Sequence, residues 1–422
     1  MSAASTLWPA LLPPSQHGRE DLRAVSARGT RVTFADGTTR LCGTSGLWNV
    51  NLGYGDPVVA DAVHRAMLDA SYLSTFRYEN AYARRAADEL VALCGPERYE
   101  RVLFSTSGGA ANDLVMKLAR QYQQLAGRPG ARLVVGLRGS FHGLTFGAHA
   151  LTGEDLGQQA YGVDQRLVRH VPPNDVEALR TLLGRAGASV AAVVVEPVLG
   201  TGAIPLERAY VEELGRLRDE HGFVLVADEV ATGFARTGVP FASAEWPVAP
   251  DVLVLSKALT NGAAAASAVL LGPRVAGAYV EADVTPAHAE TQAGTPPSMA
   301  AISAVVARMD ELDLVSAARD LGDRLDHGLT ELAARPWVSA VTGAGCFRGI
   351  QIRTPDGGLL PAEHIGDVVR SVARAGAVVH PGLNGIQLVP PLISTREEAD
   401  ELLGCVVTGV EEYLARRGGR AA

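Results

Sequence analysis

The sequence predicts an α/β protein whose large domain contains a mostly parallel sheet and whose smaller domain is α+β. Between residues 100 and 275, short apolar β-branched runs alternate with amphipathic helical segments. Apolar strands that are separated by helices are typical of a parallel sheet covered on both faces. After about residue 310 the pattern changes to helices with a few strands, which predicts the second domain. At 422 residues, the chain is long enough for both domains.

The expected elements follow one another in a simple order. Near the N-terminus, "TRVTFADGTTRL" is typical of a hairpin, and we expect residues 1–60 to belong to the smaller domain. Residues 61–310 form the predicted large domain and residues 311–422 the C-terminal small domain, which ends in the helix "STREEADELLGCVVTGVEEYLARR". Six strands of the large domain are expected at 101–106, 132–137, 190–197, 223–230, 251–257 and 267–272.

Composition and charge exclude several classes of protein. A net charge of -8 argues against nucleic acid as a partner, because phosphate binding needs a basic face. The four cysteines are far apart and form no CxxC pair, so we expect reduced thiols and no metal site. The N-terminus lacks a basic segment before its apolar residues, and the apolar runs fall short of a membrane span. We therefore expect a soluble cytoplasmic protein with no membrane partner.

Polar residues stand where the predicted strands end. "VLFST" runs into "SGGAAN", "VVVE" into "PVLGTG", "VLVAD" into "EVATG", and "VLVLS" into Lys257. Ligands of parallel sheets bind beyond the carboxyl ends of the strands. These four ends therefore predict one site that is assembled from distant parts of the sequence.

Lys257 is unusual in this composition. Of the 38 lysines and arginines, only Lys117 and Lys257 are lysines. Arginine replaces lysine as a cation but cannot lose its proton, so a lysine kept after an apolar strand indicates amine chemistry. Burial lowers the pKa of such an amine and makes it a nucleophile that forms an imine with an aldehyde. Lys117 lies within a predicted amphipathic helix, where a structural or solvated role is expected.

Two further features complete a cofactor site. Asp228 ends "FVLVAD", and a carboxylate at a strand end can pair with a pyridinium nitrogen, although it can equally cap the next turn. The segment "STSGGAAN" joins a strand to a helix, whose first N–H groups can hold a phosphate. Lysine, aspartate and phosphate cradle together are the three anchors that pyridoxal 5'-phosphate requires.

The chain resembles the class III aminotransferases, of the omega and acetylornithine type, with the fold type I of pyridoxal-phosphate enzymes. The resemblance rests on "ADEVATGFARTG" followed by "PDVLVLSKALTNG" and extends from about Trp48 to Pro391. It implies a large domain with a mostly parallel seven-stranded sheet and a smaller α+β domain. It also implies that Lys257 forms the Schiff base with the cofactor and shuttles the substrate proton, while Asp228 pairs with the pyridine nitrogen.

The resemblance implies further cofactor contacts. Ser107, Gly108 and Gly109 match the phosphate-binding turn of the family. Val230 matches the residue that packs one face of the cofactor ring. In "GSFHG", Phe141 matches the residue that stacks on the other face, and His142 follows it.

The resemblance also implies a homodimer with shared active sites. Thr291 in "HAETQAGTP" matches a threonine that reaches the phosphate of the neighbouring subunit. Trp48 falls where the N-terminal segment of family members lines the substrate pocket, although it can equally be a core residue.

Three positions depart from the family in ways that bear on the substrate. Gln387 in "IQLVPPL" stands where many members have an arginine that binds the substrate carboxylate, and Thr201 stands where they have the glutamate that pairs with that arginine. His380 stands where the diaminopelargonate-forming branch has another arginine. Neither Gln387 nor His380 can form the two parallel hydrogen bonds by which an arginine binds a carboxylate. We expect a substrate without a neighbouring carboxylate, in biosynthesis or in tailoring of a peptide or natural product.

Alternatives remain open at this point. Arg77, Arg138 or Arg348 could bind a carboxylate from elsewhere, as in a diaminopelargonate-type or omega-amino-acid aminotransferase with a rearranged site. The leading hypothesis is an aminotransferase that passes an amino group from a small-molecule amine to a carbonyl acceptor with ping-pong kinetics. Aminomutases, epimerases and lyases of the same family share the same anchors. Retention of Lys257 and Asp228 argues against a non-catalytic scaffold.

Overall fold

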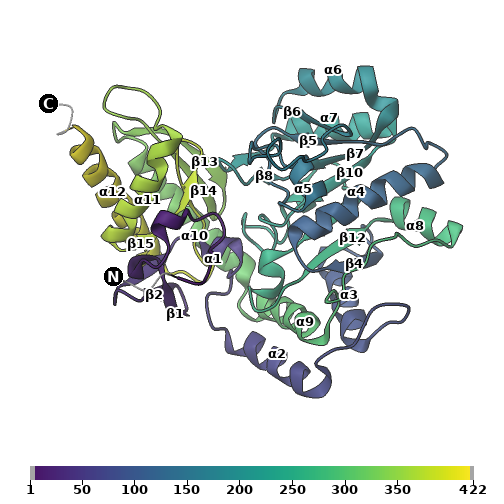
Figure 1. Cartoon of the computed structure of the whole chain (residues 1–422), viewed down its shortest axis with the longest axis horizontal. Helices are drawn as coiled ribbons and strands as arrows, with labels where there is room; N and C mark the ends of the chain where they lie inside the picture. The colour runs from purple at the N-terminus through teal and green to yellow at the C-terminus, as the bar shows by residue number, and fades with distance from the viewer. Residues whose placement is uncertain (1–4, 419–422) are drawn as a thin grey trace.

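A seven-stranded sheet forms the centre of the larger of two lobes (Figure 1). The computed structural model describes residues 5–418. The strand order is β4-β12-β11-β10-β7-β5-β6, and β12 alone runs antiparallel to its neighbours. The strands are β4 (Arg101–Ser105), β5 (Leu133–Leu137), β6 (Val168–Val171), β7 (Val190–Val195), β10 (Val224–Asp228), β11 (Val252–Leu255) and β12 (Ser267–Leu271).

Helices cover both faces of this sheet. Along β10, Val224 and Val226 pack in the same cluster as the long helix α4, whereas Leu225 packs on the opposite side with α6 and α7. This alternation follows from the two-residue period of a strand, which sends successive side chains to opposite faces. The helices of this lobe are α2 (Pro57–Ala70), α3 (Ala81–Cys94), α4 (Gly108–Leu125), α5 (Phe146–Leu151), α6 (Val176–Ala186), α7 (Arg208–His221), α8 (Pro273–Ala282) and α9 (Pro296–Glu311).

The mostly parallel seven-stranded sheet confirms the predicted fold class, and all six strands expected from the apolar runs are present. The seventh strand, β6, was missed. It has four residues, and Arg169 and His170 interrupt its apolar pattern. Because β6 lies at the edge of the sheet and pairs only with β5, it does not need apolar side chains throughout.

Segments from both ends of the chain build the smaller lobe. The predicted N-terminal hairpin is present as β2 (Arg31–Phe34) and β3 (Thr39–Cys42), which follow β1 (Ala24–Arg28). Strand β3 pairs in parallel with β15 (Ala377–Val378), so N-terminal and C-terminal segments share a sheet. A second antiparallel sheet has the order β13-β14-β17-β16, with β13 (Val338–Ala344), β14 (Phe347–Ile352), β16 (His380–Gly382) and β17 (Gly385–Leu388).

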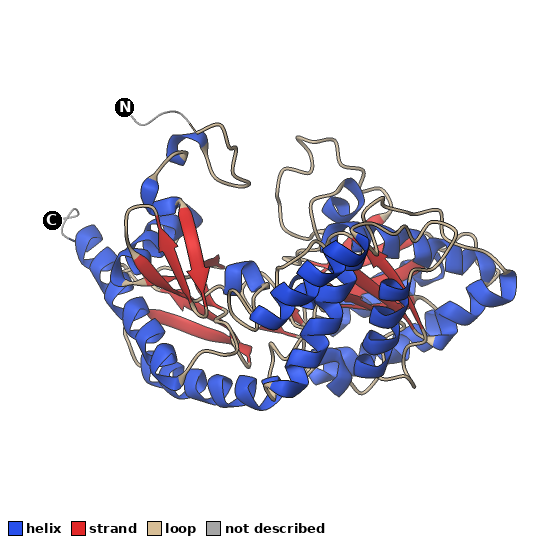
Figure 2. Cartoon of the chain, turned by 90° about the horizontal axis from the view of Figure 1, so that it is seen from below, coloured by secondary structure: helices blue, strands red, loops and turns tan. Residues whose placement is uncertain are grey.

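Three long helices pack in the smaller lobe and on its outer side, namely α10 (Leu314–Leu332), α11 (Ala362–Ala375) and α12 (Arg396–Gly418). Figure 2 shows the strands of the two lobes as separate groups with helices around them. The proposed domain limits at residues 60 and 310 remain a prediction, and residues 1–4 and 419–422 of those ranges lie outside the described part of the chain.

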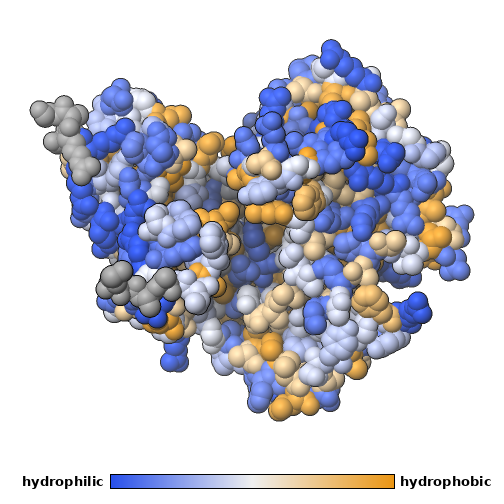
Figure 3. Space-filling view, viewed as in Figure 1, coloured by the Kyte–Doolittle hydropathy of each residue, from blue (hydrophilic) through white to orange (hydrophobic). Residues whose placement is uncertain are grey.

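The surface is deeply hollowed between the two lobes (Figure 3). The parallel strands β7, β10 and β11 all end at the same edge of the large sheet, because they run in one direction. Within residues 5–418, no helix is both long and apolar enough to cross a membrane.

Candidate active site

Lys257 follows β11 directly and opens the short 3-10 helix η5 (Lys257–Thr260). Its φ of 51° lies in the left-handed region, which a residue with a side chain adopts at a cost of about 1 to 3 kcal/mol. Burial lowers the pKa of its amine, and the carboxylates of Glu196 and Asp228 oppose that shift. The structure therefore holds a largely buried amine, in a strained turn, that loses its proton more readily than a lysine in water.

Asp228 is the last residue of β10, the neighbour of β11, and is 2% exposed. Its Oδ2 accepts hydrogen bonds from Asn112 Nδ2 at 2.8 Å and from His142 Nδ1 at 2.7 Å, and its Oδ1 accepts one from the Val230 N–H at 3.1 Å. Burial alone would lower the pKa of His142, but the hydrogen bond and charge of Asp228 raise it. Three hydrogen-bond donors thus hold a buried carboxylate at the C-terminal end of β10.

Glu196 supplies a second buried carboxyl group, just after β7. The strand-end pattern placed it at the predicted site but gave it no specific role. Its Oε2 accepts from the Phe141 N–H and its Oε1 from the Gly200 N–H, both at 3.0 Å. Burial raises the pKa of Glu196 to about 7. The side chain ties together two loops, one before and one after it in the chain, that border the strand ends.

The predicted phosphate turn forms the start of α4. Ser107 is the N-cap, and its Oγ accepts a hydrogen bond from the Ala110 N–H at 3.2 Å. The N–H groups in the first turn of a helix have no acceptor within the helix, and they attract anions. Gly109 and Gly143 approach closely, since a Cβ on Gly143 would lie 2.4 Å from the Gly109 Cα. Gly143 covers one side of the turn, but Ser107 is exposed and Gly108 and Gly109 are partly exposed, so an anion can reach the turn.

Of the two residues expected to contact the cofactor ring, Val230 packs against the phosphate turn, whereas Phe141 is partly exposed. A Cβ on Gly108 would lie 3.1 Å from Val230 Cγ1, so the valine packs directly against the turn. The backbone N–H of Phe141 donates to Glu196, and the residue is 37% exposed.

These groups fit pyridoxal 5'-phosphate. An amine of lowered pKa, a buried carboxylate for the ring nitrogen and a helix N-terminus for the phosphate all lie at one edge of the sheet. Next to Asp228, the buried His142 Nε2 and Asn112 Oδ1 have no hydrogen-bond partner in residues 5–418. In the same residues, no group of three or more acidic, histidine or cysteine side chains is arranged to hold a metal.

Trp48 forms one wall of the site. Lys257 Nζ lies 4.9 Å from the centroid of its ring system, and the His380 ring meets it edge-on at a centroid distance of 4.6 Å. Trp48 also packs against Phe347 of β14 and is only 6% exposed, so it serves both the core and the site. It ends α1 (Ser45–Trp48), a turn in which all four residues have positive φ. Left-handed backbone costs about 1 to 2 kcal/mol for each such residue other than glycine.

Arg236 holds this strained turn in place, and sequence reasoning missed it. Its guanidinium is fully buried and donates to Ser45 Oγ at 2.9 Å, to Asn51 Oδ1, and to the carbonyl of Pro390 at 2.6 Å. A longer bond of 3.3 Å reaches the carbonyl of Cys346. Arg236 therefore joins the left-handed turn to the C-terminal part of the chain. Local sequence gives no signal for this, because the partners lie up to 191 residues away.

Gln387 and His380 complete the wall beside Trp48. Gln387 is 1% exposed and its Nε2 donates to the carbonyl of Gly200 at 2.6 Å, next to Thr201. His380 Nδ1 lies 2.6 Å from the carbonyl of Pro381. Burial lowers the pKa of His380 to about 4.

Of the three candidate arginines, Arg348 is already paired, and the other two are exposed. Arg348 forms an ion pair with Asp326 at 2.5 Å and donates to the carbonyl of Gly345 at 2.7 Å. It faces away from Gln387, because Gln387 pairs with the next residue, Gly349. Arg77 and Arg138 are exposed.

Thr291 is exposed, and its carbonyl accepts a hydrogen bond from Tyr72. The preceding residue, Glu290, accepts hydrogen bonds from the Ser105 hydroxyl and from the hydroxyl and N–H of Thr106, the last at 3.2 Å. The loop that carries Thr291 is thereby tied to the phosphate turn of its own chain. Sequence reasoning did not single out Glu290.

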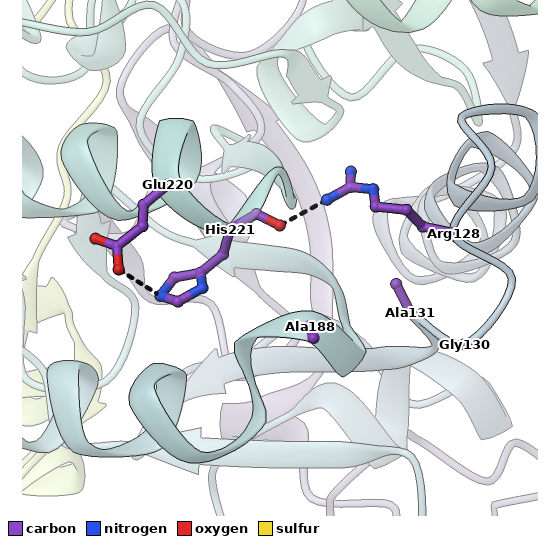
Figure 4. A pocket seen from close by; sticks show the side chains of 6 residues that line it. All are labelled: Arg128, Gly130, Ala131, Ala188, Glu220 and His221. Carbon is purple, nitrogen blue, oxygen red and sulfur yellow. Dashed lines mark hydrogen bonds and ion pairs between the residues drawn. The ribbon is translucent and has the colours of Figure 1, made fainter.

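A separate hollow of about 450 Å³ lies near the starts of β5 and β7, the ends of these strands that are opposite the active site (Figure 4). Arg128 and His221 contribute to its lining, and Arg128 donates to the carbonyl of His221 at 2.6 Å. Glu220 lies 3.6 Å from His221. The arginine is thus occupied by backbone carbonyls, and none of the strand-end residues reaches this hollow.

Comparison with known proteins agrees with this geometry. Residues 15–409 match the family model described as aminotransferase class-III. Acetylornithine aminotransferases of Thermosynechococcus vestitus and Mycobacterium leprae are each 32% identical to the chain, over 95% and 96% of it respectively and over 95% of their own lengths.

Solved structures show the same fold. A PLP-bound amine transaminase from an uncultivated Pseudomonas species has a TM-score of 0.91 at 29% identity, covering 99% of this chain and 100% of its own. An (S)-enantioselective omega-transaminase from Thermomicrobium roseum also has a TM-score of 0.91, at 26% identity and with 97% of both chains covered.

Proposed function

The chain belongs to the class-III aminotransferases, which depend on pyridoxal 5'-phosphate, and we propose that it moves an amino group from a donor amine to a ketone or aldehyde at Lys257. The observation that carries this proposal is the pairing of two strand ends. β11 leads into a largely buried amine of lowered pKa, and the adjacent β10 ends in a buried carboxylate with three hydrogen-bond donors.

When bound, the cofactor supplies an electrophilic carbonyl and a ring that accepts the electron pair released from the substrate carbon. Lys257 would hold the cofactor through its amine, and its Nζ would take up and return the substrate proton. Asp228 would keep a proton on the ring nitrogen, with His142 and Asn112 fixing the carboxylate. The N–H groups at the start of α4, with Ser107, Gly108 and Gly109, bind the phosphate.

On the substrate side, Trp48, His380 and Gln387 line the space next to Lys257. None of these three side chains carries a positive charge near pH 7 that could pair with a substrate carboxylate. We therefore propose a substrate that the usual carboxylate-binding arginine does not hold, as part of a biosynthetic or tailoring reaction. The second candidate, an acetylornithine-type or omega-amino-acid aminotransferase with a rearranged carboxylate site, is favoured by the names of the relatives.

We further propose a homodimer with shared active sites. The exposed Thr291 lies on a loop that Glu290 ties to the phosphate turn, so the loop can carry the threonine to the phosphate of a second copy. Exposed apolar side chains also gather between residues 67 and 78, which is typical of a covered surface. Light scattering tests this: a monomer at micromolar concentration, with full activity, contradicts it.

The function is tested in two steps. Amines are screened singly for conversion of the cofactor to its aminated form, and carbonyl compounds are then screened for its restoration. Lys257→Ala should slow both steps by about 10²- to 10⁴-fold, the usual contribution of a positioned proton-transfer group. Asp228→Asn should also slow both, whereas Lys117→Ala, the matched control, should not. Unchanged rates in Lys257→Ala contradict the proposal.

A further inference from the structure

His380 and Gln387 lie directly opposite each other on the antiparallel strands β16 and β17. Residues that oppose each other in such a pair point to the same face of the sheet, with Cβ atoms about 4.5 to 5.5 Å apart. Their side chains are therefore neighbours, and what each donates or accepts decides which ligand group fits between them.

The contact of His380 with the backbone determines its tautomer. A carbonyl oxygen can only accept a hydrogen bond, so Nδ1, at 2.6 Å from the Pro381 carbonyl, carries the proton. Burial and the nearby amine of Lys257 lower the pKa of His380 to about 4, so the ring is neutral near pH 7. In a neutral imidazole with the proton on Nδ1, the other nitrogen, Nε2, is an acceptor.

The same reasoning fixes the orientation of the Gln387 amide. The Gly200 carbonyl also only accepts, and it lies 2.6 Å from Nε2, so the amide nitrogen points to Gly200. If the amide were flipped, its oxygen would lie against the carbonyl oxygen of Gly200, and two acceptors would face each other. Oε1 is buried and makes no hydrogen bond of normal geometry within residues 5–418. The His380 ring lies beside it, but with its proton on Nδ1 the ring has none to donate to Oε1. A buried acceptor without a donor costs about 1 to 3 kcal/mol.

This pair of acceptors belongs to the active site. The His380 ring packs edge-on against Trp48, and the amine of Lys257 lies over the same indole ring. The amine of Lys257 and the ring of His380 therefore contact the same indole, and they are close enough for the charge of Lys257 to lower the pKa of His380.

The nearby cations are not available to a carboxylate. Arg236 is surrounded by Ser45, Asn51 and the Pro390 carbonyl. Arg348 pairs with Asp326. A carboxylate placed between His380 and Gln387 would meet two acceptors and no compensating charge, which makes its burial costly.

We propose that His380 and Gln387 form a subsite that selects substrates with an uncharged hydrogen-bond donor, an amide N–H or a hydroxyl, and rejects a carboxylate at the same position. This inference rests on the proposed aminotransferase function and names the substrate class of that same site. An N–H or O–H group satisfies the buried Gln387 Oε1 and the Nε2 of His380, whereas an alkyl group satisfies neither.

Three primary amines with the same chain test the proposal on the holoenzyme: 4-aminobutanamide, 4-aminobutanoate and 4-methylpentylamine, with homologues one methylene shorter and longer. Rate and apparent affinity for conversion of the cofactor are measured for each. At the best chain length, the amide should exceed the alkyl amine about tenfold in rate over apparent Kd, because one buried acceptor gains a partner. The carboxylate should be the poorest of the three.

Variants then locate the preference. His380→Phe keeps a ring against Trp48, and Gln387→Met keeps the shape of the side chain, but each removes an acceptor. In both variants, the rate over apparent Kd for the amide, divided by that for the alkyl amine, should fall toward one, and most of the change should be in apparent Kd. His364→Phe, on the helix α11 away from Trp48, is the matched control and should keep the wild-type ratio. If a variant fails to fold, the wild-type series still decides.

A second measurement separates this inference from the proposed function. Pentanamide and pentanoate lack the amine and cannot react, and their binding to the holoenzyme is measured by calorimetry. Tighter binding of the amide supports the subsite even if no amine converts the cofactor, in which case the proposed function alone falls. Binding of pentanoate as tight as that of pentanamide, or equal reaction of 4-aminobutanoate and 4-aminobutanamide, overturns the subsite.

Discussion

Replacement of Arg236 by methionine removes the tie between the left-handed turn and the rest of the chain. The guanidinium makes three hydrogen bonds to Ser45, Asn51 and Pro390 and a longer one to Cys346. None of these partners is a carboxylate. Methionine is similar in volume to the stem of arginine but bonds to none of these oxygens, so Arg236→Met tests what the contacts contribute.

The structure sets the expected magnitude. Hydrogen bonds from a charged donor contribute about 1.5 to 3 kcal/mol each, so three good ones contribute about 6 kcal/mol. Burial opposes this: it lowers the pKa of Arg236 to about 10, which at 1.36 kcal/mol per pKa unit corresponds to a cost of about 3 kcal/mol. The net loss in Arg236→Met is about 3 kcal/mol. With an unfolding entropy of about 2.1 cal/mol/K per residue, the thermal midpoint should fall by about 3 °C.

The assay is calorimetric unfolding of the holoenzyme, combined with the apparent affinity for a reactive amine. Because Arg236 positions the turn that ends in Trp48, the variant should also bind amines more weakly, with a smaller effect on the rate at saturation. Arg348→Met is the control: it loses an ion pair to the half-exposed Asp326 and should leave amine affinity unchanged. An Arg236→Met protein with wild-type midpoint and wild-type amine affinity would refute the reasoning.

Three further predictions concern ionisable groups. The folded-state pKa of His380 lies below its unfolded value, so its contribution to stability is present above pH 6.5 and is lost as pH falls from about 6.5 to 4; His380→Phe should lack this loss in midpoints measured across that range. Glu196 has a raised pKa, so its contribution is present below about pH 4.5 and is lost as pH rises to about 7. The thermal midpoint of Glu196→Gln should therefore rise relative to that of the wild type between about pH 4.5 and 7. A difference in midpoint that stays constant across this range would contradict the prediction. Glu290→Gln should weaken cofactor binding about tenfold in equilibrium dialysis, because it loosens the loop that carries Thr291; an unchanged Kd would contradict that role.

Much of the fold follows from local pattern. The strands that lead to Asp228 and Lys257 are continuous apolar runs, and a run of this kind has few alternatives to a buried parallel strand. Lys257 itself stood out because arginine replaces nearly every other lysine. Strand β6 was missed because an edge strand tolerates polar residues, which removes the periodic signal.

The rest depends on contacts between distant residues. Nothing near Arg236 in the sequence indicates that it meets Ser45 and Pro390. The resemblance to the family implied that Gln387 and His380 stand where arginines are usual, but their hydrogen-bonding state depends on the carbonyls of Gly200 and Pro381. Likewise, Glu290 gains its role only because the fold places it beside Ser105 and Thr106.

The central claim is that amino transfer at Lys257 proceeds in two separate half-reactions. The direct measurement uses the holoenzyme with a single reactive amine and no carbonyl acceptor, and follows the cofactor spectrum and the carbonyl product together. The account predicts one equivalent of product per active site, with the cofactor left in its aminated form until an acceptor restores it. Continued turnover of the amine alone, with the cofactor spectrum unchanged at the end, would contradict it and identify a mutase, epimerase or lyase.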